Sequence, residues 1–166
     1  MKTNLLMDFT VDKENCMVNV RREFNAGIDD VWSAWTEAEI LDQWWAPAPF
    51  KSKTKSMEFQ EGGRRLYAMI SPEGTEGWST FDYTSVSPKT NFKYKSTFSD
   101  AEGNPNSEFG SSSWDVNFSQ QGDSTFVDIY IKRDSFEELE KIVAMGFKEG
   151  FTSAMESLDK IFEAKK

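Results

Sequence analysis

Hydrophobic and polar residues alternate along much of the chain between residues 9 and 131. The clearest alternating segments are residues 9–11, 17–24, 66–70, 92–98, 114–118 and 127–131. Residues 78–86 form a further predicted strand with an ambiguous inner face, because Trp78 and Val86 oppose Phe81 and Tyr83. Turn-forming residues separate these segments. The pattern predicts an antiparallel sheet with one packed and one solvated face.

Two short helices are predicted between the first hairpin and the rest of the sheet. Apolar residues from Ile28 to Trp35 recur at helical spacing. Thr36 and Glu39 match a capping box that would begin a second helix, with Thr36 as its N-cap. Pro47 and Pro49 follow, and proline cannot continue a helix, so we expect this second helix to end before them.

One long helix is predicted after the last strand. Ser135 and Glu138 match a second capping box, and an apolar stripe at three- and four-residue spacing continues to Phe162. Roughly 28 residues would span about 42 Å, enough to cross a whole sheet. Gly146 and Gly150 lie on this stripe, although glycine in a helix costs about 1 kcal/mol relative to alanine. We expect them to leave space for sheet side chains or for a bound molecule.

The order of these elements predicts a two-layer α+β fold. A hairpin is followed by two short helices, an antiparallel meander and a long helix that lies across a curved sheet. No linker, repeat or low-complexity segment divides the sequence. The length of 166 residues suits one domain, so we expect a single domain over residues 1–166.

Composition excludes several classes of function. The sequence has no histidine, which removes Ser-His-Asp triads and Cys-His dyads, and its lone Cys16 removes disulfides and cysteine-based zinc sites. We predict neither a metal nor a cofactor. The net charge of −9 argues against nucleic acid as a partner. No apolar run approaches the roughly 20 residues of a membrane span, and no secretory signal begins the chain, so we expect a cytoplasmic protein.

Aromatic residues are unusually frequent, with 14 phenylalanines and 6 tryptophans. Such residues favour strands, and they also suit the wall of an apolar cavity. Asp82, on the strand of uncertain facing, is the best carboxylate candidate for chemistry, whereas Asp128 alternates with apolar neighbours and is expected on the solvated face. Alternate acidic and asparagine residues between 100 and 108 mimic calcium-loop spacing, but Pro105 replaces the glycine that the loop needs.

Short motifs in this order resemble a known family. They are REFNA at 22–26, VWSAWT at 31–36, LDQWWAP at 41–47, EGGR at 61–64, MGF at 145–147 and LDKI at 158–161. The chain resembles the Activator of Hsp90 ATPase homologue 1-like domain of the START/Bet v 1-like (SRPBCC) superfamily, from about residue 9 to the C-terminus. The family often has Gly-Trp where this chain has Gly146-Phe147.

The resemblance implies a helix-grip fold, in which a curved antiparallel sheet wraps around a long C-terminal helix and a cavity often opens between them. Known superfamily members bind lipids, hormones or other hydrophobic ligands, and some act on polyketides. The eukaryotic namesake stimulates the Hsp90 ATPase and carries a further N-terminal domain. We expect no such domain within 166 residues, so activation of Hsp90 does not follow from the family name.

The leading functional hypothesis is a binding protein for a small hydrophobic or amphipathic ligand. One alternative is a stress-related or co-chaperone-like accessory module whose acidic surface recruits a protein partner. Another is a histidine-independent enzyme of the cyclase or hydrolase type, and binding is preferred over catalysis. At least half of the expected ligand-binding residues should face one common space: Trp32, Trp35, Trp44, Phe50, Met69, Trp78, Tyr94, Trp114, Phe147, Phe151 and Met155.

Overall fold

Eight antiparallel strands form one curved sheet in the order β1-β2-β8-β7-β6-β5-β4-β3. The computed structural model describes residues 5–106, 108 and 110–165. The strands are β1 (Met7–Asp12), β2 (Met17–Phe24), β3 (Lys51–Met57), β4 (Arg64–Ile70), β5 (Glu76–Ser87), β6 (Asn91–Ser99), β7 (Ser111–Gln121) and β8 (Ser124–Lys132). The alternating pattern therefore predicted the sheet correctly, and the ordering pairs β2 with β8 across the length of the chain.

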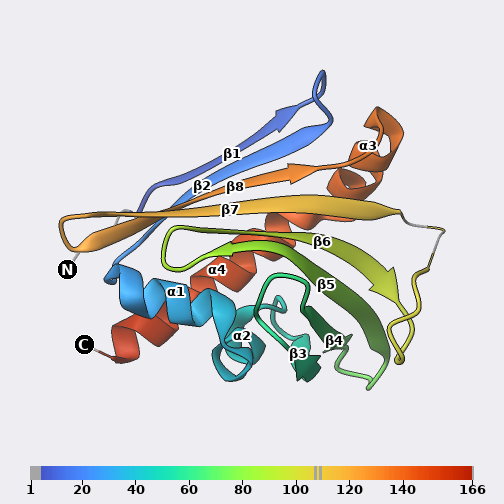
Figure 1. The fold of residues 1–166 in the computed structure, drawn as a ribbon, viewed down its shortest axis with the longest axis horizontal. Helices are drawn as coiled ribbons and strands as arrows, with labels where there is room; N and C mark the ends of the chain where they lie inside the picture. The colour runs from blue at the N-terminus through green and yellow to red at the C-terminus, as the bar shows by residue number, and fades with distance from the viewer. Residues whose placement is uncertain (1–4, 107, 109, 166) are drawn as a thin grey trace.

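The helices form the second layer. They are α1 (Ile28–Thr36), α2 (Ala38–Trp44), α3 (Phe136–Ala144) and α4 (Phe147–Ala164). Figure 1 shows α4 crossing behind β5, β6 and β7, with α1 beside its C-terminal end. The predicted two-layer helix-grip arrangement is confirmed. None of the helices in the described part of the chain is long and apolar enough to cross a membrane.

The long C-terminal helix is confirmed as α4, but the prediction that it runs unbroken from residue 135 is wrong. The helix breaks between α3 and α4 at Gly146, whose φ of +85° is left-handed. The Gly146 amide donates to the Val143 carbonyl at 3.1 Å, which closes the last turn of α3. Side chains with a Cβ rarely adopt this conformation, so glycine ends α3 here and lets α4 begin at a new angle.

One of the two predicted capping boxes is also wrong. Thr36 is the last residue of α1, and its hydroxyl donates to the Trp32 carbonyl at 2.8 Å instead of capping α2. Glu37 occupies the N-cap position of α2 and makes no side-chain capping bond. The second box is confirmed at α3, where the Ser135 side chain accepts a hydrogen bond from the Glu138 amide at 3.2 Å.

Asp42 fastens α2 to the sheet edge. Its carboxylate accepts hydrogen bonds from the Ser52 and Thr54 hydroxyls of β3, at 2.9 and 2.8 Å, and from the Thr54 amide. It also pairs with Arg65 of β4 at 3.2 Å, and the Arg65 side chain is fully buried. Hydrogen bonds to charged groups are stronger than neutral ones. This anchor positions the two tryptophans that follow it at the end of α2.

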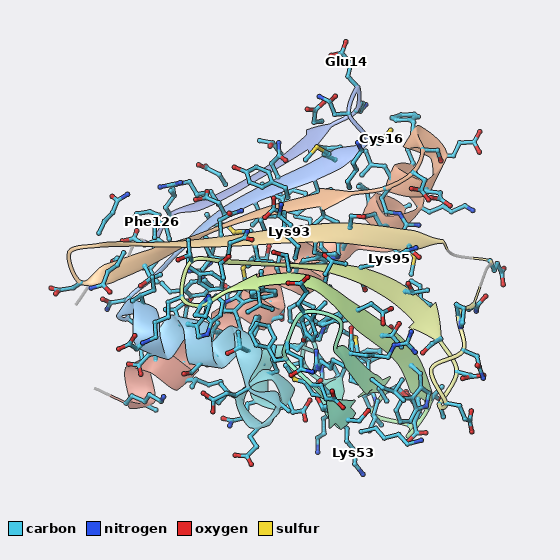
Figure 2. The ribbon with its side chains drawn as sticks, in the orientation of Figure 1. Glu14, Cys16, Lys53, Lys93, Lys95 and Phe126 are labelled. Atoms are coloured by element: carbon cyan, nitrogen blue, oxygen red, sulfur yellow. The ribbon has the colours of Figure 1, made fainter. Side chains whose placement is uncertain are left out.

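The outer face of the sheet carries paired charges. Arg64 donates to Asp82 at 2.6 Å, and Arg21 pairs with Asp128 at 2.8 Å. Lys93 and Lys95 of β6 lie on the same face, turned away from α4 (Figure 2). The expectation for Asp128 is confirmed, and Asp82 also lies outside, because Phe81 and Tyr83 are the inward residues of β5.

Candidate functional site

A cavity of about 350 Å³ opens between the sheet and the junction of α3 with α4. Strands β4 to β8 supply one wall, and the end of α2 with the two C-terminal helices supplies the other. Its lining residues are Trp45, Pro47, Tyr67, Met69, Gly77, Ser79, Ser96, Phe98, Ser112, Trp114, Ile131, Arg133, Ile142, Met145, Gly146, Phe147, Gly150 and Phe151.

The cavity exists because small side chains occupy one end of the inner sheet face. Gly77 and Ser79 of β5, Ser96 of β6 and Ser112 of β7 all line it, and Ser96 pairs in register with Ser112. The other end of the same strands carries large rings that belong to the buried core: Phe81, Tyr83, Phe92, Tyr94 and Phe118. Glycine and serine leave volume where the neighbouring rows have aromatic rings, so the sheet is full at one end and hollow at the other.

An aromatic floor borders this hollow. Trp45 at the end of α2 and Trp114 of β7 have ring centroids 5.8 Å apart, and each lies within about 6 Å of the Phe151 ring. Phe147 stacks on Phe151 at 5.4 Å. Two of these four contacts are edge-to-face, one is tilted and one is stacked, and such contacts favour fixed ring orientations. The floor therefore offers an apolar surface of ring faces and edges to a guest molecule.

Apart from the Trp45 indole, the polar side chains that line the cavity lie on the strands or directly after them. The Trp45 indole donates to the Tyr67 hydroxyl at 3.0 Å, and Tyr67 also shares a hydrogen bond with Ser79. Burial raises the pKa of Tyr67, although the nearby charge of Arg65 and these hydrogen bonds oppose the rise. Tyr67 is therefore a neutral hydroxyl at pH 7, a group that can exchange hydrogen bonds but carries no charge.

Arg133 contributes a buried charge to the cavity wall. It follows β8, and only 3% of the residue is exposed. Its guanidinium donates to the Ser112 hydroxyl at 2.8 Å and lies 3.9 Å from the Glu138 carboxylate on α3. No other residue lining the cavity in the described part of the chain has an ionised side chain at pH 7.

The predicted site residues divide into three groups. Four of the eleven line the cavity: Met69, Trp114, Phe147 and Phe151. Five pack in or against the hydrophobic core without lining it: Trp32, Trp35, Trp44, Tyr94 and Met155. The last two lie elsewhere, Phe50 being 44% exposed and Trp78 contacting Lys55 at 5.8 Å. Fewer than half therefore share the common space that was expected, since the small residues of the sheet confine the hollow to one end.

Both helix glycines of the sequence hypothesis line the cavity, but for different reasons. Gly146 is required by its backbone conformation, and a Cβ there would meet no atom within 4 Å. Gly150 lies inside α4, where a Cβ would approach only Pro47, at 3.7 Å. Space at Gly150 therefore agrees with the expectation, whereas Gly146 is primarily a helix terminator.

The expected site residues did not include Trp45, Arg133 or the three serines. They included Trp44 in place of Trp45, and Trp44 is fully buried and donates to the Ala34 carbonyl. The serines interrupt apolar columns on three strands that are adjacent in the sheet. That signal is visible in the sequence only once the strand register is known.

Comparisons with known proteins agree with this architecture. A sequence profile of the family described as Activator of Hsp90 ATPase homolog 1-like protein matches residues 25–163. A crystal structure of a Mycobacterium smegmatis protein has a TM-score of 0.89 at 23% identity, covering 98% of this chain and 100% of that chain. No curated protein matches the sequence.

Two further solved structures have the same fold. A solution structure of a protein from Arthrobacter aurescens also has a TM-score of 0.89, at 26% identity, covering 95% of this chain and 91% of that chain. A crystal structure from Silicibacter pomeroyi, which carries the family's name, has a TM-score of 0.71 at 15% identity, covering 90% of this chain and 99% of that chain.

Proposed function

The chain belongs to the Activator of Hsp90 ATPase homolog 1-like family, and on that premise we propose that it is a cytoplasmic, single-domain carrier or sensor of a small amphipathic molecule. The ligand lies in the cavity between the sheet and the α3–α4 junction, with its apolar part on the aromatic floor. Met69, Trp114, Phe147 and Phe151 contact it, together with Trp45.

The observation that carries this proposal is the hollow itself. Its volume of about 350 Å³ falls at the small end of the roughly 300–1,000 Å³ that is typical of ligand sites. A chain rich in large aromatic residues places glycine and serine on three adjacent strands of the inner face. A core selected only for stability would fill this space, because each cavity of methyl size or larger costs about 1 kcal/mol.

The same geometry bears on the two alternatives. A protein-binding module that acts through its acidic surface needs no internal cavity, so the hollow favours ligand binding. A histidine-independent enzyme would need an acid or base such as a carboxylate in the cavity. Within residues 5–106, 108 and 110–165, no aspartate or glutamate lines it, and Asp82 pairs with Arg64 on the outer face. No observation therefore favours catalysis over binding.

The test fills the cavity and measures binding of a neutral apolar probe. N-phenyl-1-naphthylamine, whose fluorescence rises in apolar surroundings, should bind the wild-type protein saturably at one site. Gly150→Leu should weaken that binding roughly tenfold or more, equivalent to about 1.4 kcal/mol, because the new side chain occupies the probe's volume.

Glu156→Leu is the matched control. Glu156 lies on the same helix but is exposed and does not line the cavity, so this variant adds the same side chain without filling the site. It should bind the probe as wild type does. Absence of saturable binding to the wild-type protein, or equal binding by a folded Gly150→Leu variant, would overturn the proposal.

A further inference from the structure

Arg133 is the one positively charged residue among the described, largely apolar residues that line the cavity. The residue is 3% exposed and lines the cavity beside Ile131 and Ser112. Its ion-pair partner Glu138 lies on α3, with its carboxylate 3.9 Å from the guanidinium, and does not line the cavity. The guanidinium also donates to the Ser112 hydroxyl of the cavity wall at 2.8 Å, so the positive member of the pair is the one that belongs to the wall.

This ion pair lies in surroundings that screen it weakly. Burying a charge is costly, and proteins accept the cost where the charge is paired and hydrogen-bonded or serves a site. Interactions between charges inside a protein are several times stronger than in water. The remaining polar groups that face the hollow, including Tyr67, Ser79, Ser96 and Ser112, are neutral hydroxyls. A guest molecule thus meets one region of positive potential within an otherwise neutral wall.

We propose that the ligand is a monoanionic amphiphile, a small carboxylate with an apolar body; this inference rests on the proposed function. Its carboxylate lies at Arg133 and the hydroxyls of Ser96 and Ser112, and its apolar body lies against Trp114 and Phe151. Arginine is the side chain best suited to carboxylates, because its planar fork gives charge-assisted hydrogen bonds. A cationic amphiphile is rejected by the same charge.

Because the protein as a whole is negatively charged, a preference for anionic ligands would identify a local positive group in the cavity. The chain carries a net charge of −9, which repels anions from the molecule as a whole. A preference for an anionic ligand must therefore come from a local positive group. Among the residues that line the cavity, Arg133 is the group that supplies it.

The experiment compares three probes that share one alkyl chain: octanoate, 1-octanol and octylamine. Each competes with N-phenyl-1-naphthylamine for the wild-type protein at pH 7. Octanoate should bind about tenfold or more tightly than 1-octanol, which is about 1.4 kcal/mol, and octylamine should bind most weakly. This comparison needs no variant, so it decides the question even if substitution of Arg133 prevents folding.

Arg133→Met should then abolish the preference, so that the ratio of the octanoate affinity to the 1-octanol affinity falls to about one. Arg64→Met is the control, because it removes one positive charge from an exposed residue that pairs with Asp82 outside the cavity. Equal binding of octanoate and 1-octanol by wild type would overturn this inference alone. Failure of the naphthylamine and all three alkyl probes to bind would overturn the proposed function as well.

Discussion

Replacing Gly150 with a larger residue is expected to stabilise the folded protein. Gly150→Ala removes the helix penalty of glycine, up to about 1 kcal/mol. Its Cβ would lie 3.7 Å from the Pro47 side chain, an ordinary contact that needs no movement of neighbours. The gain should therefore appear almost in full as an increase in the free energy of unfolding.

Gly150→Leu tests whether the space beyond that Cβ is real. The longer side chain would enter the cavity and bury further carbon atoms, each worth about 0.8 kcal/mol, while losing roughly 0.5–1 kcal/mol of rotamer entropy. We expect a total gain of about 2 kcal/mol over the wild type. In a protein of this size each 1 kcal/mol raises Tm by about 2–4 °C.

The assay is urea denaturation followed by tryptophan fluorescence, with thermal unfolding as a second measurement. The m-value should stay constant, so that the change in midpoint reports stability. Glu156→Leu should change stability by no more than about 0.5 kcal/mol, as exposed substitutions usually do. If Gly150→Leu instead loses about 1–3 kcal/mol, the side chain overpacks the core and the reasoning from open space is refuted.

Three further predictions concern the helix break, an ion pair and pH. Gly146→Ala should destabilise the protein by about 1–2 kcal/mol, measured by urea denaturation, because its φ of +85° is strained for any residue with a Cβ; an unchanged midpoint would contradict this reading. Asp159→Ala should cost about 3 kcal/mol in the same assay, since Arg22 is only 5% exposed and would lose its carboxylate partner; a loss below about 0.5 kcal/mol would mean that the pair contributes little. Burial raises the pKa of three tyrosines of the inner face, Tyr67, Tyr83 and Tyr94. The unfolded chain releases these protons first, so the free energy of unfolding should begin to fall near pH 10 and fall further above it. A free energy of unfolding that stays constant to pH 12 would contradict this prediction.

Much of the fold followed from local patterns in the sequence. Alternation identified the inward residues of β2, where Val18, Val20 and Phe24 are almost completely buried. The capping box at Ser135 correctly marked the start of α3. These signals depend on neighbours within a few residues, so one sequence is enough to read them.

The helix break was missed because the apolar stripe continues through Gly146. Apolar residues recur at similar spacing in one continuous helix and in two helices separated by a left-handed residue. Only the backbone conformation distinguishes the two cases. Thr36 was misassigned for a related reason. Its hydroxyl can bond forward as a cap or back to a carbonyl four residues earlier, and the structure has the second arrangement.

The site was harder to predict than the fold because it depends on register across distant strands. Ser79, Ser96 and Ser112 are separated by long stretches of sequence, and the connection between β6 and β7 is too long to fix their alignment. Arg133 lies just beyond a strand, where the alternation that assigns faces ends. The predicted site residues were mainly large aromatic residues, whereas small residues of the sheet create the hollow.

The most direct test of ligand binding is a titration of the ¹⁵N-labelled protein with octanoate, followed by amide and indole resonances. We predict saturable shifts concentrated at Trp45 and Trp114 and at the amides of Ser96, Ser112 and Gly150, with the indoles of the tryptophans outside the cavity little changed. Shifts concentrated instead at the groove between Asn25, Asp123 and Phe162, at the far end of α4, or no saturable shift anywhere, would contradict a ligand site between the sheet and the α3–α4 junction.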